Sequence, residues 1–465
     1  MIYDLAIIGA GSGGLSVAAA AAQFGQKVIL FEKGKMGGDC LNYGCVPSKA
    51  LIAAAKQAHV FRTSGPYGIS AAEPRVDFKK VHAHIRKVIA AIEPNDSAAR
   101  FEKLGVKVVL GAAKFRDAKT VETSEGLFAA RRFVIATGSR PAIPAIPGLE
   151  TVPYFTNETI FENTVLPKHL IIIGGGASGI ELAQAYRRLG SEVTVVEAFE
   201  PLAKDDPELT AIVLENLQRD GVKILAHYPI KKISKAKSVI VVETSGRGKI
   251  TGSHLLVATG RTANIEGLNL EAAGIVYTTK GVTVDESLRS SQKHIYAIGD
   301  VAGGLQFTHV ATYHAGLVIR NALFRLPVTN RADIIPHVTF TDPELAQVGL
   351  TEAEARKKFG PSIKVVRWPF HDNDRAQAEG KTTGLIKAII GKRGKILGVG
   401  IVGANAGEII QPWVLAMTEG LRIRAIAGMV APYPTLGEIN RRVAVNYFSD
   451  FTSKSWVRRV IRQLS

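Results

Sequence analysis

One local pattern occurs twice in the chain, and this duplication restricts the possible folds more than any other feature. The first copy consists of an apolar strand over residues 2–8, the turn Gly9-Ala-Gly11-Ser-Gly-Gly14, a helix over 15–24, a strand over 27–31 and Glu32. Gly9 permits a tight turn, Gly11 lets the backbone approach a pyrophosphate, and Gly14 lets the helix pack on the strand. Glu32 is placed to accept hydrogen bonds from an adenosine ribose. Together these features predict a dinucleotide site.

The second copy follows in the middle of the chain. It consists of an apolar strand over residues 169–173, the turn Gly174-Gly-Gly176-Ala-Ser-Gly179, a helix over 180–189, a strand over 191–196 and Glu197. A glycine-rich turn alone is weak support for a ligand, but strand, glycines, helix, strand and acid in register are specific. Two complete copies predict two bound dinucleotides and two Rossmann-like α/β domains.

Glu197 bears on which nicotinamide nucleotide the second site prefers. A carboxylate at this position accepts a hydrogen bond from the free 2′-hydroxyl of NAD and repels the 2′-phosphate of NADP. No arginine occurs in residues 198–203 to clamp a phosphate, although Lys204 is close enough in sequence to assist one. The sequence therefore favours NAD over NADP.

Length and composition set the class of protein. A chain of 465 residues is too long for one core and predicts about three domains. Its 46% hydrophobic and 21% charged residues are typical of a soluble globular protein, and no apolar run approaches the roughly 20 residues that span a bilayer. With the first strand beginning at Ile2, there is no room for a signal peptide, so we expect a cytoplasmic protein.

The net charge of +17 has several interpretations. Anionic cofactors, an anionic membrane surface and simple solubility all remain open. Nucleic acid is disfavoured, because the sequence shows no zinc finger, helix-turn-helix signature or long basic block.

The chain has only two cysteines, Cys40 and Cys45, and both lie just after the first fingerprint. A zinc site is disfavoured because no other cysteine and no His-x-x-His cluster could complete it, so no metal is expected. In a regular helix, Cα atoms five residues apart are about 8–9 Å from each other. Since a disulfide needs Cα atoms within about 7 Å, the segment must be distorted or lie at a helix start, which Gly44 permits. A helix start would also lower a thiolate pKa.

Motifs along nearly the whole chain resemble those of the flavoprotein disulfide reductases, which include dihydrolipoamide dehydrogenase, glutathione reductase and mercuric reductase. In chain order they are the first fingerprint, Gly37 to Lys49 around the cysteines, Ala136-Thr137-Gly138, the second fingerprint with Glu181, Ala258 to Arg261, Ala297 to Asp300, and Tyr433 to Glu438. The resemblance implies that the first site binds FAD and the second binds NAD(P)H.

The resemblance also implies roles for individual residues. Electrons pass from the flavin to the disulfide through Cys45, and Cys40 is the thiol that exchanges with substrate. Lys49 lies by the flavin and pairs with Glu181, while Asp300 binds the ribityl chain. The remaining motif residues expected to contact the two cofactors are Gly38, Thr137, Gly138 and Gly260.

The family layout implies an FAD-binding domain in two segments, residues 1–145 and 266–330, separated by an NAD(P)-binding domain over 146–265. Residues 331–465 form an α+β dimerisation domain. In this family, the dimerisation domain completes the active site of the partner subunit, so we expect a homodimer.

The C-terminal motif departs from the disulfide-reducing members. Those enzymes carry a histidine base followed five residues later by a glutamate; here Glu438 is present, but Tyr433 occupies the histidine position and Ala431 is no substitute. Tyrosine, with an ordinary pKa of about 10, is a poor base at neutral pH. Mercuric reductases do carry this tyrosine, but they need a second cysteine pair. Ala177, where many relatives place an aromatic gate, suggests an open nicotinamide pocket.

The chain ends in a predicted basic amphipathic helix. Its apolar face comprises Trp456, Val457, Val460, Ile461 and Leu464, and its basic face comprises Lys454, Arg458 and Arg462. Such a helix can dock on its own domain, or bind a membrane surface or an acidic partner.

These observations predict an FAD-dependent NAD(P)H:disulfide oxidoreductase of the dihydrolipoamide dehydrogenase type, with electrons passing through Cys40 and Cys45. A small disulfide or a lipoyl group is the expected substrate. One alternative is a mercuric reductase-like or quinone/metal-ion reductase without the histidine base. An alternative of another class is a thiol redox sensor with a docking tail.

Overall fold

The computed structural model describes residues 1–245, 248–452 and 455–464, and the chain divides into two compact units. The first unit comprises residues 1–174, 185–196 and 228–330, and the second comprises 175–184, 197–227 and 331–465. The predicted domain boundaries at residues 145, 265 and 330 stay predictions.

A five-stranded sheet of parallel pairs forms the centre of the first unit. Its order is β20 (Ile295–Ala297), β8 (Phe133–Ile135), β2 (Leu5–Ile8), β3 (Val28–Glu32) and β4 (Lys107–Leu110). All four residues of β2 are buried, as expected for an apolar strand covered on both faces. Its alternating side chains divide between two cores: Leu5 and Ile7 belong to one cluster, and Ala6 and Ile8 to the other.

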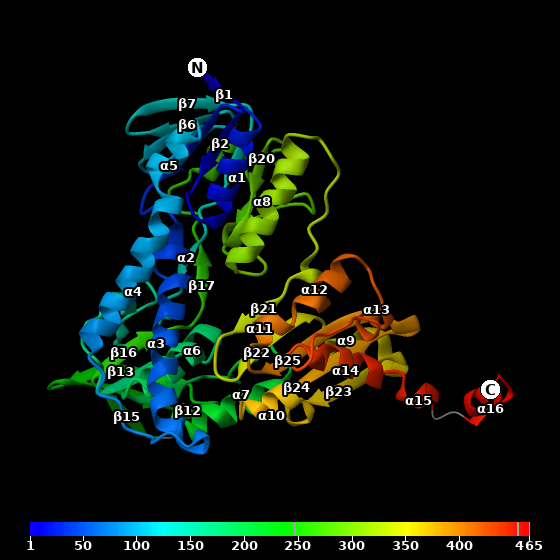
Figure 1. Cartoon of the computed structure of the whole chain (residues 1–465). Coiled ribbons are helices and arrows are strands. Elements are labelled where there is room, and N and C mark those ends of the chain that lie inside the picture. The colour runs from blue at the N-terminus through cyan, green and yellow to red at the C-terminus, as the bar shows by residue number, and fades with distance from the viewer. Residues whose placement is uncertain (246–247, 453–454, 465) are drawn as a thin grey trace. The chain divides into compact units, whose positions relative to one another are not determined.

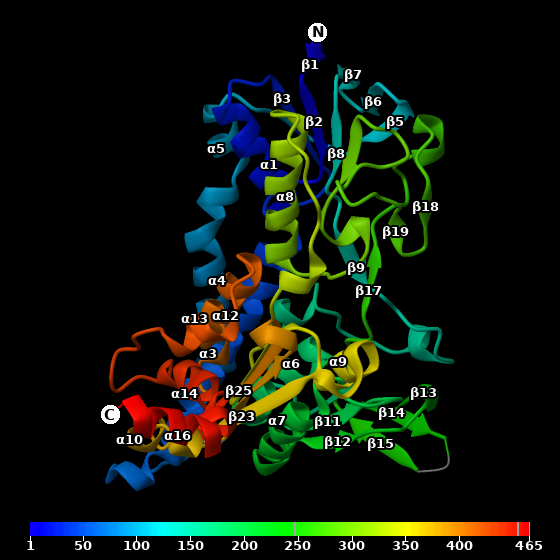
Figure 2. The same ribbon diagram turned by 90° about the vertical axis from the view of Figure 1, so that its right-hand side faces the viewer.

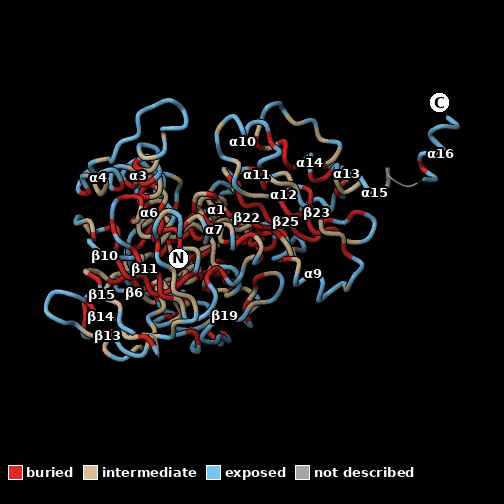
Figure 3. Tube along the Cα trace, turned by 90° about the horizontal axis from the view of Figure 1, so that it is seen from below, coloured by how far each residue is buried: buried red, intermediate tan, exposed pale blue. Residues whose placement is uncertain are grey.

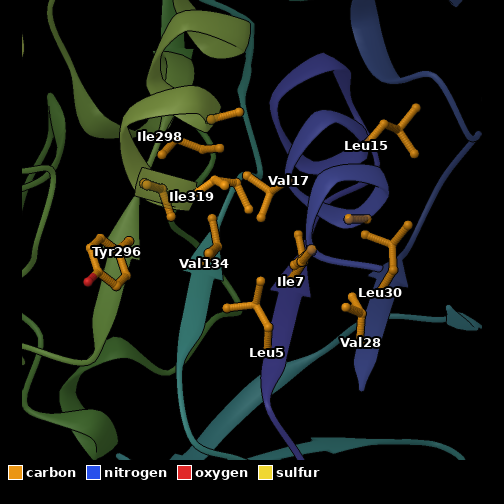
Figure 4. Close-up of a cluster of buried hydrophobic side chains, with 14 of the residues drawn as sticks. Leu5, Ile7, Leu15, Val17, Val28, Leu30, Val134, Tyr296, Ile298 and Ile319 are labelled. Atoms are coloured by element: carbon orange, nitrogen blue, oxygen red, sulfur yellow. The ribbon is translucent and has the colours of Figure 1, made fainter. Parts of the chain in front are cut away.

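Two helices, α1 (Ser12–Gln23) and α8 (Thr308–Ala322), lie side by side on one face of this sheet (Figure 1; Figure 2). Figure 4 shows Ile7 of β2 and Val134 of β8 packed with Val17 of α1 and Ile319 of α8. Burial of each such aliphatic side chain contributes about 1.5–3 kcal/mol. This core fixes where both helices begin, which is the edge that carries the site described below.

The second fingerprint also lies on parallel strands. Strand β10 (His169–Ile173) pairs in parallel with β11 (Glu192–Val196) and with β16 (His254–Val257). An antiparallel sheet of β13 (Ile230–Ala236), β14 (Val239–Thr244) and β15 (Lys249–Gly252) shares a hydrophobic core with β10 and β16. The helix after the second glycine turn is α6 (Ala177–Arg188).

The other helices and strands of the first unit are β1 (Ile2–Tyr3), α2 (Gly38–Asn42), α3 (Cys45–Thr63), α4 (Phe78–Ile92), α5 (Ala98–Lys103), β5 (Lys114–Asp117), β6 (Thr120–Thr123), β7 (Gly126–Ala130), β9 (Ser139–Pro141), β17 (Arg261–Ala263), β18 (Tyr277–Thr278) and β19 (Gly281–Val282).

The second unit is built on a five-stranded antiparallel sheet. Its order is β21 (His337–Thr339), β22 (Glu344–Gly349), β25 (Ile396–Gly403), β24 (Leu385–Ile390) and β23 (Lys364–Pro369). Every residue of β25 is buried, and this sheet appears largely red in Figure 3. A Cβ on Gly400 would overlap Leu209 of helix α7 (Pro207–Arg219), so the glycine lets this helix pack onto the sheet. The parallel α/β sheets of the nucleotide fingerprints, together with the α+β architecture of the C-terminal residues, confirm the predicted fold class.

The other elements of the second unit are α7 (Pro207–Arg219), β12 (Lys223–Leu225), α9 (Glu352–Phe359), α10 (Asp374–Ala378), α11 (Ala406–Ile409), α12 (Gln411–Thr418), α13 (Ile423–Ala427), α14 (Glu438–Asn446), α15 (Ser449–Thr452) and α16 (Ser455–Leu464). Within the described residues, no helix is both long enough and apolar enough to cross a membrane.

Candidate active site

The two cysteines are separated by a break between two helices. Helix α2 ends at Asn42, and α3 begins at Cys45 itself. Gly44 between them has φ −123° and ψ −108°, far from helical values. Cys45 is therefore the first residue of a 19-residue helix, where the partial positive charge of the helix start favours a thiolate.

The two sulfurs are thiols in this structure and differ strongly in acidity. The hydrogen bond from Cys40 lowers the pKa of Cys45 to about 6, with further help from Thr308 and Lys49, while burial and Asp39 oppose the shift. The same hydrogen bond, together with burial, raises the pKa of Cys40 above its ordinary value. Near neutral pH the pair is a monoanion with its charge on Cys45 and its proton on Cys40.

Two hydroxyl groups from other helices contact the sulfurs. Thr308 is the first residue of α8, and its Oγ1 lies 3.3 Å from Cys45 Sγ. Ser12 is the first residue of α1 and hydrogen-bonds to Cys40. Sequence analysis missed both. Ser12 lies inside the glycine turn, so its position near the site could have been predicted from the sequence. Thr308 lies 263 residues from Cys45 in the chain, so no local motif connects the two residues.

A charged network adjoins the cysteine segment. Arg261 Nη2 lies 3.1 Å from Asp39 Oδ1, and Arg261 Nε donates to Ser139 Oγ at 2.6 Å. Ser139 Oγ in turn donates to Asp300 Oδ2 at 2.5 Å. Burial raises the pKa of Asp300, the residue expected to bind the ribityl chain. Asp39 and Ser139 were not predicted as site residues from the sequence. Arg261 was identified as part of the motif Ala258 to Arg261, but no function was predicted for its side chain.

The first glycine turn is closed by Glu32. Its Oε2 accepts from Ala10 N–H at 2.6 Å, and its Oε1 accepts from Gly34 N–H at 2.7 Å. Gly9 has φ +108°, and a Cβ there would overlap the carbonyl oxygen of Ala136, so only glycine fits.

The remaining residues predicted at the first site surround the same turn. A Cβ on Gly14 would overlap the Gly9 carbonyl oxygen, and a Cβ on Gly38 would lie 2.7 Å from Gly11 Cα. A Cβ on Gly11 would meet nothing closer than 3.9 Å, so the middle of the turn borders open space at a helix start. These features fit the pyrophosphate of FAD.

Thr137 and Gly138 follow strand β8. The Thr137 hydroxyl donates to the Asn264 carbonyl oxygen at 2.7 Å, and the Asn264 side chain donates to the Thr137 carbonyl oxygen at 2.9 Å. Gly138 has φ +66°, a conformation that favours glycine. The pair of hydrogen bonds fixes the chain immediately before Ser139.

The second glycine turn repeats the first. Glu197 Oε2 accepts from Gly175 N–H at 2.6 Å, and its Oε1 accepts from Phe199 N–H at 2.9 Å. Gly174 has φ +109°, and a Cβ there would overlap the carbonyl oxygen of Ala258. Around Gly176 there is no atom within 4 Å of the position a Cβ would take, so this turn also borders open space.

Gly179 is buried in α6, and Gly260 adopts φ +125° with open space where a Cβ would point. The conformation of Gly260 would be strained for any residue with a side chain. The second turn fits the pyrophosphate of a dinucleotide, as the first turn does.

Lys49 and Glu181 belong to different units, so their predicted pairing stays a prediction. Lys49 lies one turn after Cys45 in α3 and helps to lower the pKa of that thiol. Glu181 is buried in α6, and its Oε1 accepts from Phe340 N–H at 2.9 Å. Ala177 is the first residue of the same helix.

Tyr433 is held by an acid within its own unit. Its hydroxyl donates to Asp374 Oδ2 at 2.8 Å, and this hydrogen bond raises the pKa of Tyr433. Glu438 is buried at the start of α14, where its Oε1 accepts from Arg442 Nε at 2.9 Å. Neither bond leaves Tyr433 a better base than free tyrosine.

The predicted tail helix is present as α16. Its predicted basic residue Lys454 lies outside the described residues, and Val457 is buried. The other apolar side chains are exposed by 55% at Trp456, 44% at Val460, 59% at Ile461 and 83% at Leu464. Figure 3 shows α16 in pale blue over most of its length.

Two family models match the chain. Residues 3–315 match the model described as pyridine nucleotide-disulphide oxidoreductase, and residues 335–444 match the dimerisation domain of the same family. The second match supports a homodimer.

Curated relatives and solved structures agree with this assignment. The chain is 36% identical over 455 residues to mercuric reductase of Lysinibacillus sphaericus, covering 96% of this chain and 83% of that protein. It is 36% identical over 457 residues to dihydrolipoyl dehydrogenase of Geobacillus stearothermophilus, covering 94% of each.

Among solved structures, the Cu(II) complex of the HOCl-induced flavoprotein disulfide reductase RclA from Escherichia coli aligns with a TM-score of 0.86 and 27% identity, covering 96% of this chain and 99% of that one. LpdA from Mycobacterium tuberculosis aligns with a TM-score of 0.89 and 25% identity, covering 96% and 100%.

These matches confirm the predicted family, enzyme class and cofactors. The chain belongs to the pyridine nucleotide-disulphide oxidoreductases, flavoenzymes that use FAD and NAD(P)H.

Proposed function

We propose that the enzyme exchanges electrons between NAD(P)H and a small dithiol–disulfide couple of the dihydrolipoamide type, through Cys40 and Cys45. The observation that carries this proposal is the unequal acidity of the two thiols, with the pKa of Cys45 lowered to about 6. One sulfur is thus charged at neutral pH while the other keeps its proton. A thiol pair of this kind is suited to disulfide exchange.

Exchange balances within the pair. Cys40, as a thiolate, attacks one sulfur of the substrate disulfide, which breaks that disulfide and leaves a mixed disulfide and a substrate thiol. Cys45 then attacks the Cys40 sulfur, the Cys40–Cys45 disulfide forms, and the second substrate thiol leaves. Two electrons and the single proton of the monoanionic cysteine pair pass to the substrate, and solvent supplies the second proton. When bound, FAD supplies hydride transfer between the nicotinamide and this pair.

The site residues have matching proposed roles. Glu32 and the first glycine turn hold FAD, Asp300 binds its ribityl chain, and Lys49 paired with Glu181 stabilises negative charge beside Cys45. Gly260, the second turn and Glu197 hold the nicotinamide nucleotide, with NAD favoured over NADP. The predicted domain boundaries at residues 145, 265 and 330 are part of the same proposal.

Anaerobic reduction of the purified flavoprotein by NADH tests the proposal. A long-wavelength charge-transfer band should appear, and it should disappear when added lipoamide oxidises the cysteine pair. Cys45→Ser should abolish both the band and lipoamide reduction. A normal rate of lipoamide reduction in Cys45→Ser would contradict the role of the thiol pair.

A second candidate activity, reduction of a quinone or of a soft metal ion, is favoured by the contact at Tyr433. Since its hydroxyl donates to Asp374 and its pKa is raised, Tyr433 is a poor replacement for the histidine base. Similar chains include a mercuric reductase, and the RclA structure holds Cu(II). Faster NADH oxidation with a quinone, Cu(II) or Hg(II) than with lipoamide would select this activity.

The redox sensor stays a third prediction. It would be selected by negligible turnover with every acceptor together with reversible oxidation of the Cys40–Cys45 pair. A thiol-labelling assay across a series of glutathione redox buffers measures that oxidation directly.

We also propose that α16 binds the surface of anionic membranes. Its exposed apolar side chains, among them Trp456, Ile461 and Leu464, are accompanied by Arg458, Arg459 and Arg462, and the helix contains no acidic residue. This composition matches a helix that lies in the headgroup region of a negatively charged bilayer.

Flotation of the full-length enzyme with vesicles tests the tail. Binding is expected with phosphatidylglycerol-containing vesicles and not with phosphatidylcholine alone, and Ile461→Ser should weaken it. The matched control is Ile143→Ser, an exposed isoleucine elsewhere. Equal binding to both vesicle types, or no binding, would contradict the proposal, and a dimer that dissociates in Ile461→Ser would assign α16 to the subunit interface.

A further inference from the structure

Thr308 contacts the cysteine pair from a distant part of the chain. Its Oγ1 lies 3.3 Å from Cys45 Sγ. The same hydroxyl hydrogen-bonds to Cys40 and lowers the pKa of that thiol as well. One hydroxyl group therefore serves both sulfurs.

The direction of these bonds follows from the charge on the sulfur. A thiolate has no proton to donate, so the Thr308 hydroxyl must be the donor in a bond to it. The position of Thr308 adds to this effect, because the first residue of the 15-residue helix α8 carries the partial positive charge of the helix start. Thr308 thus favours negative charge on whichever sulfur it contacts.

Disulfide exchange needs that charge at two places. At rest the charge lies on Cys45, because Cys40 keeps its proton and donates it in a hydrogen bond. Cys40 can attack a substrate disulfide only as a thiolate. The shared proton must therefore pass from the Cys40 sulfur to the Cys45 sulfur, which leaves the total charge of the pair unchanged.

We propose that Thr308 is a catalytic residue that donates its hydroxyl hydrogen bond to Cys45 at rest and to Cys40 during exchange. The inference rests on the proposed disulfide reductase function. One hydroxyl group then stabilises the Cys45 thiolate before the proton moves and the Cys40 thiolate after it has moved. Thr308 keeps its own proton throughout.

Other charged groups also act on the pair. Lys49 of α3 lowers the pKa of Cys45, and Asp39 of α2 raises it. Ser12 of α1 hydrogen-bonds to Cys40. All three are unchanged in a Thr308 variant, so a difference between Thr308→Val and Thr308→Ser reports the hydroxyl alone.

The experiment measures alkylation of the holoenzyme by iodoacetamide as a function of pH. Thr308→Val removes the hydroxyl at nearly constant volume, and Thr308→Ser keeps it. Each is made in a Cys40→Ser background, which reports Cys45, and in a Cys45→Ser background, which reports Cys40. In both backgrounds Thr308→Val should move the alkylation midpoint up by about one pH unit, the size expected for a lost hydrogen bond to a charged group. Thr308→Ser should leave the midpoint in place.

The matched control is Thr312→Val, an exposed threonine one turn later in α8 whose hydroxyl donates to the Thr308 carbonyl oxygen at 3.4 Å. It should not move the midpoint. Retained flavin absorbance and an unchanged unfolding midpoint show that each variant is folded, and Thr308→Ala replaces Thr308→Val if the latter fails this check.

Three results would overturn the inference. They are no shift in either background, equal shifts in Thr308→Val and Thr308→Ser, and a shift confined to one cysteine. Alkylation requires no turnover, so it separates the two proposals. A shift in an enzyme that reduces no disulfide would overturn the proposed function alone, and normal disulfide reduction without a shift would overturn the role of Thr308 alone.

Discussion

The two glycine turns are closed in the same way but are held by different surroundings. In each, a glutamate at or just after the end of the second strand, Glu32 or Glu197, accepts one N–H from the turn and one from two residues further along the chain. The local pattern in the sequence therefore produces the same local structure twice. What differs is the segment that follows.

The first turn leads to the thiol pair. Gly38 approaches Gly11 so closely that a Cβ on Gly38 would lie 2.7 Å from Gly11 Cα. Ser12, inside the turn, hydrogen-bonds to Cys40. The first glycine turn and the segment that carries the thiols are thus packed directly against each other.

The second turn leads to a buried charge cluster. After Glu197 the chain reaches Asp205, which lies 2.7 Å from His337 Nε2, and Asp206, whose Oδ2 lies 2.9 Å from Lys387 Nζ. Only 4% of the Lys387 side chain is exposed, and it also contacts Glu352 at 2.8 Å. A nucleotide turn without thiols is anchored instead by ion pairs to the C-terminal sheet.

The comparison shows that the glycine fingerprint specifies a tight turn closed by a glutamate and nothing more. Redox chemistry enters only where cysteines follow the turn. The segment that follows the second turn forms ion pairs with residues more than 100 positions away in the chain. Five predictions test the two regions, from the largest expected effect to the smallest.

Cys45→Ser should break the link between the first turn and redox chemistry. We expect lipoamide reduction to fall by at least about 10³-fold, because the thiolate that closes the disulfide is lost, while FAD remains bound. Steady-state kinetics and the flavin spectrum measure the two effects. In the Cys40→Ser variant a hydroxyl donor replaces the Cys40 thiol donor, so alkylation of Cys45 should be half-maximal near pH 6 and rise with pH. A midpoint near pH 9 would show that this acidity requires Cys40.

Lys387→Met should break the anchor of the second turn. It leaves the buried Asp206 and the half-buried Glu352 without their shared cation, so we expect a loss of about 3–5 kcal/mol in the free energy of unfolding. Lys381→Met is the matched control, since Lys381 is 44% exposed and pairs only at the surface with Glu379, and it should cost less than about 1 kcal/mol. Urea denaturation compares the two, and similar losses would contradict an anchoring role.

The same cluster predicts a pH dependence of stability. Although burial alone would raise it, hydrogen bonds from Lys387 and Arg356 lower the pKa of Glu352 from 4.5 to about 2. Because the folded pKa is the lower one, the contribution of Glu352 is present above pH 4.5 and is lost as the pH falls towards 2. Lys387→Met should remove most of this dependence, which urea denaturation across that pH range measures.

Glu197→Gln and Glu32→Gln compare the two ribose positions directly. Removing the carboxylate charge at Glu197 should shift the ratio of kcat/KM for NADPH to that for NADH by about tenfold towards NADPH, since the repulsion of the 2′-phosphate is lost. Glu32→Gln should leave this ratio unchanged and weaken FAD retention instead. A change of nucleotide preference in Glu32→Gln would reverse the two assignments.

Tyr433→Phe should have the smallest effect. Because the Tyr433 hydroxyl donates to Asp374 and its pKa is raised, we expect less than about a threefold change in lipoamide turnover and no new limb in the pH–rate profile. The loss of a basic limb together with a fall of about 10²-fold or more would show that Tyr433 acts as the base. Asp374→Asn serves as the control for the hydrogen bond itself.

Sequence analysis was most successful where a residue acts through its neighbours in the chain. The glycines, Glu32 and Glu197 depend on backbone conformation within a few residues, so spacing and residue type suffice to find them. For the cysteine segment the sequence left two possibilities, a distortion or a helix start, and the structure places a helix start at Cys45. Ser139, Thr308 and Lys387 act through contacts between strands and helices far apart in the chain. Nothing near them in the sequence states which partner they meet.

The sequence by itself therefore determined the family, two nucleotide turns, the position of the thiol pair and the absence of the usual histidine. Only the tertiary structure decided that Cys45 is the more acidic sulfur, that Thr308 serves both thiols, and that Lys387 balances buried carboxylates beyond the second turn. The physical reason is that a turn is fixed by local steric limits, which each residue carries with it. Acidity and charge balance depend on every group within a few ångströms, and folding alone brings those groups together.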